Sequence, residues 1–195
     1  MGATWMLSAF ATWIGIFIPH QQILFTTIDK NALHKKGNPM TLMGKPEYII
    51  DKLPKMFLAA AVYKCQLNVN YFHINDCIFE GQSSEEPARS KTATISINDE
   101  FAFNKNKQRM LGSLSSACKN NVFVSTLNQP GDEFDKMRRS PSFKKIVLDW
   151  KRDPRIKDQE LFKRNYIAKN GMENWNREID RKFSRENQMY LFEPE

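Results

Sequence analysis

The first 28 residues contain no lysine, arginine, aspartate or glutamate, and this stretch constrains the fold more than any other part of the chain. The run from Ala3 to Ile18 is almost wholly apolar or small. Pro19, His20 and two glutamines interrupt it, and a second apolar patch covers Ile23 to Phe25. A helix that is apolar all round is buried, either in a protein core or in a membrane. The sequence therefore predicts that residues 1–28 are buried in lipid or in protein.

An uncleaved membrane span is the favoured form of this segment. A cleaved secretory signal is disfavoured, because no basic residue precedes the apolar run and Pro19–Gln21 is unlike a cleavage site. A span needs about 20 apolar residues, a length that the segment reaches if it continues through Pro19 with a kink. The segment is predicted to pack against other helices through Trp5, Trp13, Gly15 and Pro19. A helix lying in the membrane interface, or buried in a partner protein, is the alternative.

Prolines, glycines and changes in composition divide the rest of the chain into three parts. Residues 29–53 are predicted to be an extended basic strap along a partner or a membrane surface, with a plain linker as the alternative. Residues 54–129 are predicted to be a small mixed α/β region. Residues 130–195 are predicted to be a charged, amphipathic helical region.

Strand-like alternation recurs in the middle part. It is found at Leu67 to Tyr71, at Thr92 to Ile97 and at Val122 to Leu127. Because the connections between these runs are short, a small antiparallel sheet is predicted. The predicted fold class is α+β, with an N-terminal single transmembrane helix, the antiparallel sheet in the middle and short angled helices at the C-terminus.

The C-terminal part shows helix signals and many aromatic residues. Ser140–Pro141 predicts a helix start, and the apolar residues from Phe143 to Trp150 have helical spacing. A second helix is predicted to start at Asp153–Pro154 and to end at Asn170–Gly171. The aromatics predict a surface for docking a partner, with a compact helical core as the alternative; they are Phe143, Trp150, Phe162, Tyr166, Trp175 and Phe183.

Catalytic motifs are not found in the sequence. There is no glycine-rich phosphate loop, no nucleophile elbow and no CxxC pair. Acidic pairs such as Asp99–Glu100 are interpreted as turn residues. The three cysteines predict reduced thiols, and the alternative is a zinc site whose ligand set is Cys65, His73, Cys77 and Cys118. No catalytic or cofactor-binding residue is predicted, and a non-catalytic chain is expected.

These observations predict an accessory, structural subunit of a large multi-subunit membrane complex. The mitochondrial inner membrane is favoured, with a complex of respiratory-chain or ATP synthase type, and the expected partners are other subunits and lipid. The net charge of +7 permits an RNA- or ribosome-associated protein as the alternative. Nucleic acid is the weaker choice because charges of both signs are mixed along the chain. A membrane-tethered enzyme that uses His73 or zinc is the third hypothesis.

Overall fold

A computed structural model describes residues 2–58, 63–66, 69–72, 76–83 and 92–182, with the backbone alone at residues 58, 63–66 and 69–72. The chain forms two compact units, Gly2–Val124 and Ser125–Glu195. The predicted part boundaries at 28/29, 53/54 and 129/130 stay predictions.

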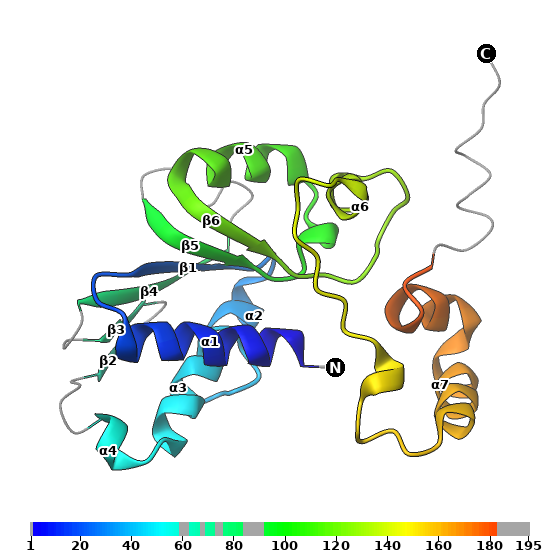
Figure 1. Cartoon of the computed structure of the whole chain (residues 1–195), viewed down its shortest axis with the longest axis horizontal. Helices are drawn as coiled ribbons and strands as arrows, with labels where there is room; N and C mark the ends of the chain where they lie inside the picture. Colours follow the sequence, from blue (N-terminus) through cyan, green and yellow to red (C-terminus); the bar gives the residue numbers. More distant parts are fainter. Residues whose placement is uncertain (1, 59–62, 67–68, 73–75, 84–91, 183–195) are drawn as a thin grey trace. The chain divides into compact units, whose positions relative to one another are not determined.

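The first unit is built on a six-stranded sheet with strand order β2-β3-β4-β1-β5-β6 (Figure 1). Strands β4, β1, β5 and β6 are parallel to one another, and β2 and β3 are antiparallel strands at the β4 edge. In chain order the strands are β1 (Gln22–Thr26), β2 (Tyr63–Gln66), β3 (Val69–Phe72), β4 (Cys77–Gln82), β5 (Ala93–Asn98) and β6 (Cys118–Phe123).

The parallel strands show that the predicted α+β class with a small antiparallel sheet is wrong. The fold is α/β, and antiparallel pairing is confined to β2, β3 and their junction with β4. In β1, Ile23 lies opposite Phe79 of β4 and Ile95 of β5. Alternation within one run reveals a strand but not its partner, and these partners are far away in the sequence. Parallel neighbours need a long crossover, so no local turn signal reports them.

The predicted transmembrane helix is also wrong. Helix α1 (Ala3–Phe17) has 15 residues and a length of about 22 Å, whereas a bilayer core is about 30 Å thick. No helix in the described part of the chain is long and apolar enough to cross a membrane. The chain leaves α1 and turns at His20, whose φ of 57° is left-handed. It then returns as β1, the strand that holds the second apolar patch.

Strand β1 explains why the second apolar patch of the N-terminal stretch carries no charge. Ile23, Leu24, Phe25 and Thr26 are all buried, as expected for an inner strand of a parallel sheet with both faces covered. On α1 the buried side chains are mostly small: Ser8, Ala11, Thr12 and Gly15. The Ser8 and Thr12 hydroxyls each donate to a carbonyl one turn earlier, at 2.8 Å. Small, internally satisfied side chains let the helix approach the sheet closely.

Helices cover both faces of the sheet. The helices α1, α2 (Lys30–Leu33) and α3 (Gly44–Lys52) lie on one face, and α5 (Lys107–Ala117) lies on the other (Figure 1). Beyond α3 lies the short α4 (Lys55–Leu58). The core of the first face joins α1 to the sheet and to the segment that follows α2; its members include Ala11, Ile14, Ile23, Phe25, Leu42, Met43, Phe79 and Ile97.

The second unit contains α6 (Glu133–Arg139), a 3₁₀ turn (Trp150–Arg152), α7 (Gln159–Asn174) and a π turn (Trp175–Ile179). The helix predicted after Ser140–Pro141 does not form, and the side chains of Ile146 and Val147 are 89% and 65% exposed. The apolar residues of this segment do not share one buried face. Only Trp150 joins the core cluster of this unit, in which it packs with Trp175 and Ile179. Gly171, where the sequence predicts a helix end, breaks the α7 geometry with a φ of 83°.

Candidate functional site

The carboxyl ends of the four parallel strands meet at one edge of the sheet. Thr26 lies opposite Gln82 and Asn98, and Asn98 lies opposite Phe123. In open α/β sheets, ligands bind at this edge. Asp99 is the first residue after β5, and the N-terminus of α1 reaches the same place.

The contact between Thr4 and Asp99 defines the candidate site. The Thr4 hydroxyl lies 3.1 and 3.2 Å from the two carboxylate oxygens of Asp99, to which it donates. Thr4 is in the first turn of α1. The helix begins directly after Gly2, whose φ of 79° is left-handed. This turn contains no acidic side chain. Its backbone N–H groups and the positive end of the helix dipole therefore favour an anionic ligand here.

A buried polar network fixes the strand ends beneath Asp99. The Thr26 hydroxyl donates to the Asn98 side-chain carbonyl at 2.7 Å. The Asn98 amide donates to the Ser96 hydroxyl at 2.8 Å and to the Val122 carbonyl at 3.0 Å. The Asp99 N–H donates to the Thr26 carbonyl at 2.9 Å. Because satisfied buried networks are rigid, β1, β5 and β6 hold Asp99 in a fixed position.

The charges around Asp99 leave its carboxylate incompletely compensated. Burial raises the pKa of Asp99 above its ordinary value, and the Thr4 hydrogen bond and the Lys45 charge only partly oppose this. The next residue, Glu100, is exposed and has a left-handed φ of 55°, which is uncommon for a residue other than glycine. Two adjacent carboxylates thus stand at the strand edge, one held in place and one exposed.

The four residues of this site come from three separate places in the sequence, and the sequence patterns did not point to them. Thr4 was assigned to a span, Lys45 to a strap, and Asp99 and Glu100 to a turn. One local signal was present: an alternating strand, Thr92 to Ile97, followed almost directly by two carboxylates. The other half of the site, Gly2-Ala3-Thr4 at a helix start, is too short a pattern to be specific.

The predicted zinc set is only partly described. His73 and the side chain of Cys65 lie outside the described residues. Cys77 and Cys118 are buried cysteines at the starts of β4 and β6. Burial raises the pKa of both thiols, so they are held as thiols rather than thiolates. The described residues contain no group of three or more His, Cys, Asp or Glu side chains that could hold a metal. The zinc site stays a prediction.

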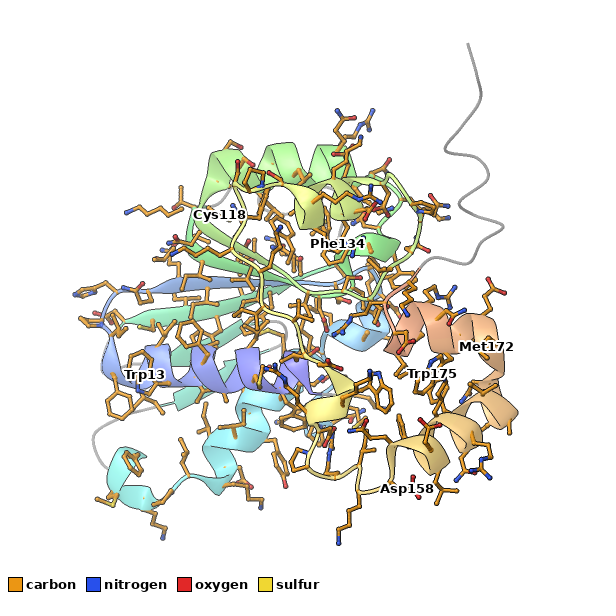
Figure 2. All side chains as sticks on the ribbon, turned by 45° about the vertical axis from the view of Figure 1, so that its right-hand side comes forward. Trp13, Cys118, Phe134, Asp158, Met172 and Trp175 are labelled. Carbon is orange, nitrogen blue, oxygen red and sulfur yellow. The ribbon has the colours of Figure 1, made fainter. Side chains whose placement is uncertain are left out.

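The residues predicted for membrane packing lie on different sides of α1. Gly15 is buried on the sheet side, whereas Trp13 is 49% exposed and projects away from the sheet (Figure 2). Trp5 is partly buried and meets the ring of Tyr48 edge-on at 5.8 Å. Pro19 is exposed in the turn that leads to β1.

Four of the six predicted docking aromatics pack against one another in the second unit. Trp150 and Trp175 are 5% and 1% exposed, and their ring centroids are 4.9 Å apart. Phe162 and Tyr166 pack on Trp175 at 5.9 and 5.6 Å. Phe143 is 39% exposed, and Phe183 lies outside the described residues. This cluster builds a small internal core, and the docking surface stays a prediction.

Comparisons with known proteins show the fold. No model of a protein family and no curated protein matches the chain. Among solved structures, the chain is similar to the large terminase ATPase domain of Thermus phage P74-26. An arginine-to-alanine mutant of that domain has a TM-score of 0.68 and 14% sequence identity, with 94% of this chain and 85% of that one covered. The unsubstituted domain gives the same score and identity, with 84% of its chain covered.

The shared fold corrects the predicted function. An accessory subunit anchored in a membrane complex requires a span, and the apolar segment assigned to it forms α1 and β1 of an α/β domain. The predicted location in the mitochondrial inner membrane, which rested on the basic charge and the lack of a disulfide framework, also required a span and is wrong for the same reason. The ribosome-associated alternative required a partner to bury this segment, but the chain's own core buries β1 and one face of α1.

Proposed function

We propose that residues 2–124 form the nucleotide-binding core of a Mg²⁺-dependent nucleoside triphosphatase. The observation that carries this proposal is the hydrogen bond between Thr4 and Asp99, which joins the start of α1 to the end of β5. In P-loop NTPases, a Ser or Thr at the start of the helix and an Asp from the Walker B strand together hold Mg²⁺. The domain of similar fold is named an ATPase domain, which supports the same assignment.

The donor groups of this site fit magnesium bound together with a nucleotide. A hydroxyl and carboxylates are hard oxygen ligands of the kind that Mg²⁺ prefers. The described residues offer no cluster of three or more metal-binding side chains. Mg²⁺ typically uses one or two carboxylates and takes its remaining ligands from substrate phosphates and water. The site therefore suits a metal that arrives with a phosphate ligand.

Each residue then has a distinct role. Thr4 and Asp99 would hold the metal, which when bound neutralises charge on the transferred phosphoryl group. The N–H groups at the start of α1 bind phosphate oxygens. Glu100, exposed beside Asp99, would orient and deprotonate the attacking water. The buried Thr26–Asn98 network keeps this edge rigid.

One departure from the phosphate-loop pattern favours a second candidate function. The phosphate-loop motif ends in Gly-Lys-Ser or Gly-Lys-Thr. The corresponding residues at the start of α1 are Gly2, Ala3 and Thr4. Ala3 provides no ammonium group for the phosphates. This observation favours a domain that binds the nucleotide without turning it over.

Steady-state ATP hydrolysis with and without Mg²⁺ tests the proposal. We expect Mg²⁺-dependent turnover, and Glu100→Gln should lower kcat by at least about 100-fold, the usual contribution of a general base, while ATP binding is kept. Asp51→Asn, at a carboxylate that is 71% exposed on α3, is the matched control and should leave kcat unchanged. ATP binding without turnover in the unsubstituted chain would support the second candidate instead. Turnover that Glu100→Gln does not reduce would contradict the assigned base.

A further inference from the structure

Lys45 is a buried lysine in a place that does not suit a cation. It is the second residue of α3 and is only 9% exposed. The N-terminus of a helix carries positive partial charge, so an ammonium group there is repelled. Burial lowers the pKa of Lys45 below its ordinary value, which shows that desolvation also works against its charge. Two unfavourable effects therefore act on one side chain.

The groups in contact with the Lys45 ammonium are two backbone carbonyls and an aromatic ring, and none of these carries a negative charge. Its Nζ donates to the Met40 carbonyl at 2.9 Å and to the Thr41 carbonyl at 3.3 Å. The same Nζ lies 5.8 Å from the centre of the Trp5 ring. An ammonium has three N–H donors, and these contacts with carbonyls use two of them.

The negative charges that act on Lys45 are those of the candidate site. Attraction to Asp99 and Glu100 opposes the effect of burial on its pKa. Trp5, which contacts Lys45, follows Thr4, which contacts Asp99. The first turn of α1 thus contacts both Lys45 and Asp99.

We infer that Lys45 supplies the fixed positive charge that stabilises the phosphates of a nucleoside triphosphate bound at Thr4 and Asp99. This inference rests on the proposed function. In Gly-rich phosphate loops a lysine next to the Ser or Thr reaches the β- and γ-phosphates, and Ala3 stands in that place here. Lys45 replaces the missing charge from α3. Its contribution therefore grows with the number of phosphate groups in the ligand.

The test compares the affinities of the 195-residue chain for ATP, ADP and AMP in the presence of Mg²⁺, by isothermal titration calorimetry. Lys45→Met should weaken ATP binding by about tenfold or more, as expected for a charge-assisted contact, and should weaken ADP binding less and AMP binding least. Lys45→Gln, which keeps an N–H donor for the carbonyls but not the charge, should show the same order and serves if Lys45→Met does not fold. Lys52→Met is the matched control on α3, because the Lys52 side chain is 62% exposed. It should leave the affinities for all three nucleotides unchanged.

The outcomes separate the two proposals. If the unsubstituted chain binds none of the three nucleotides, the proposed function fails and the role of Lys45 fails with it. If ATP binds equally well to the unsubstituted chain and to both Lys45 variants, the role of Lys45 is overturned and the proposed function stands. An equal loss for ATP, ADP and AMP would show a merely structural role and would also overturn the inference.

Discussion

At the scale of single residues, Asp135 and Asp99 differ in how far their partners offset the effect of burial on the carboxylate pKa. Asp135 is 1% exposed, and its carboxylate accepts from the Gly131 N–H at 3.0 Å and from Arg138 and Arg139 at 2.8 Å each. Burial alone would raise the pKa of Asp135, but these partners outweigh burial and lower it. For Asp99 burial prevails and the pKa is raised. The charge of Asp135 is compensated by its arginine partners, whereas the partners of Asp99 do not offset its burial, and under the proposed function a bound Mg²⁺ would do so.

Asp135→Asn should lower the free energy of unfolding at pH 7 by about 1–3 kcal/mol, because two arginines lose their charged acceptor. The folded-state pKa of Asp135 lies below the unfolded value of about 3.9. Its stabilisation is therefore complete above that pH and is lost as the pH falls through the folded pKa. Urea unfolding at several pH values should show the difference between the two proteins shrinking below about pH 4.

Glu133→Gln is the control for this measurement. Glu133 pairs with Lys136, which is 63% exposed, and such surface pairs contribute at most about 1 kcal/mol. A difference between Asp135→Asn and the unsubstituted chain that stayed constant from pH 7 to pH 2 would contradict the assigned role of the carboxylate.

At the scale of elements, the loop that leads into α3 fixes the position of Lys45. The Thr41 hydroxyl donates to the Asn38 carbonyl at 2.8 Å and accepts from the Gly44 N–H at 3.2 Å. A Cβ atom added at Gly44 would lie 2.1 Å from the Asn38 carbonyl oxygen. Because that oxygen belongs to the backbone, only a shift of the loop could make room.

Gly44→Ala should therefore destabilise the protein by about 1–3 kcal/mol, the usual range for overpacking. Gly112→Ala is its matched control, since a Cβ at Gly112 in α5 meets nothing within 4 Å. That change should stabilise the protein by about 0.5–1 kcal/mol through helix propensity. Denaturant midpoints measure both, and a Gly44→Ala variant as stable as Gly112→Ala would show that the close approach is absent.

The same scale shows what the sequence could and could not predict. The strand at β5 and a helix within Ala3 to Ile18 are predictable, because their patterns are local. The run from Val122 to Leu127 shares only Val122 and Phe123 with β6. Hydropathy does not tell a membrane span from a helix and an inner strand joined by a turn, and that ambiguity produced the predicted span. The pairing of β1 with β4 and β5 depends on contacts far apart in the sequence. Thr4 and Asp99, which are 95 residues apart in the sequence, meet only in the folded chain, so no local motif reports their contact.

At the scale of the whole molecule, the site belongs entirely to the unit Gly2–Val124. The carboxyl ends of β4, β1, β5 and β6 lie at one edge of the sheet because these four strands are parallel. The unit Ser125–Glu195 builds its own small core around Trp150 and Trp175. The proposed nucleotide chemistry therefore requires only the first unit, and the account depends on whether that edge binds a metal nucleotide.

The most direct test is the equilibrium affinity of the full chain for ATP, with Mg²⁺ and with EDTA, for Thr4→Val and Asp99→Asn. Thr12→Val is the control, because the Thr12 hydroxyl donates to the Ser8 carbonyl inside α1. We expect ATP binding that depends on Mg²⁺. Each site variant should weaken it by about tenfold or more, as expected when a charged or metal-binding contact is lost. Thr12→Val should bind ATP like the unsubstituted chain. ATP binding that is the same with Mg²⁺ and with EDTA and is unchanged by both site substitutions would contradict the proposed Mg²⁺–nucleotide site at Thr4 and Asp99. The absence of any ATP binding would contradict it as well.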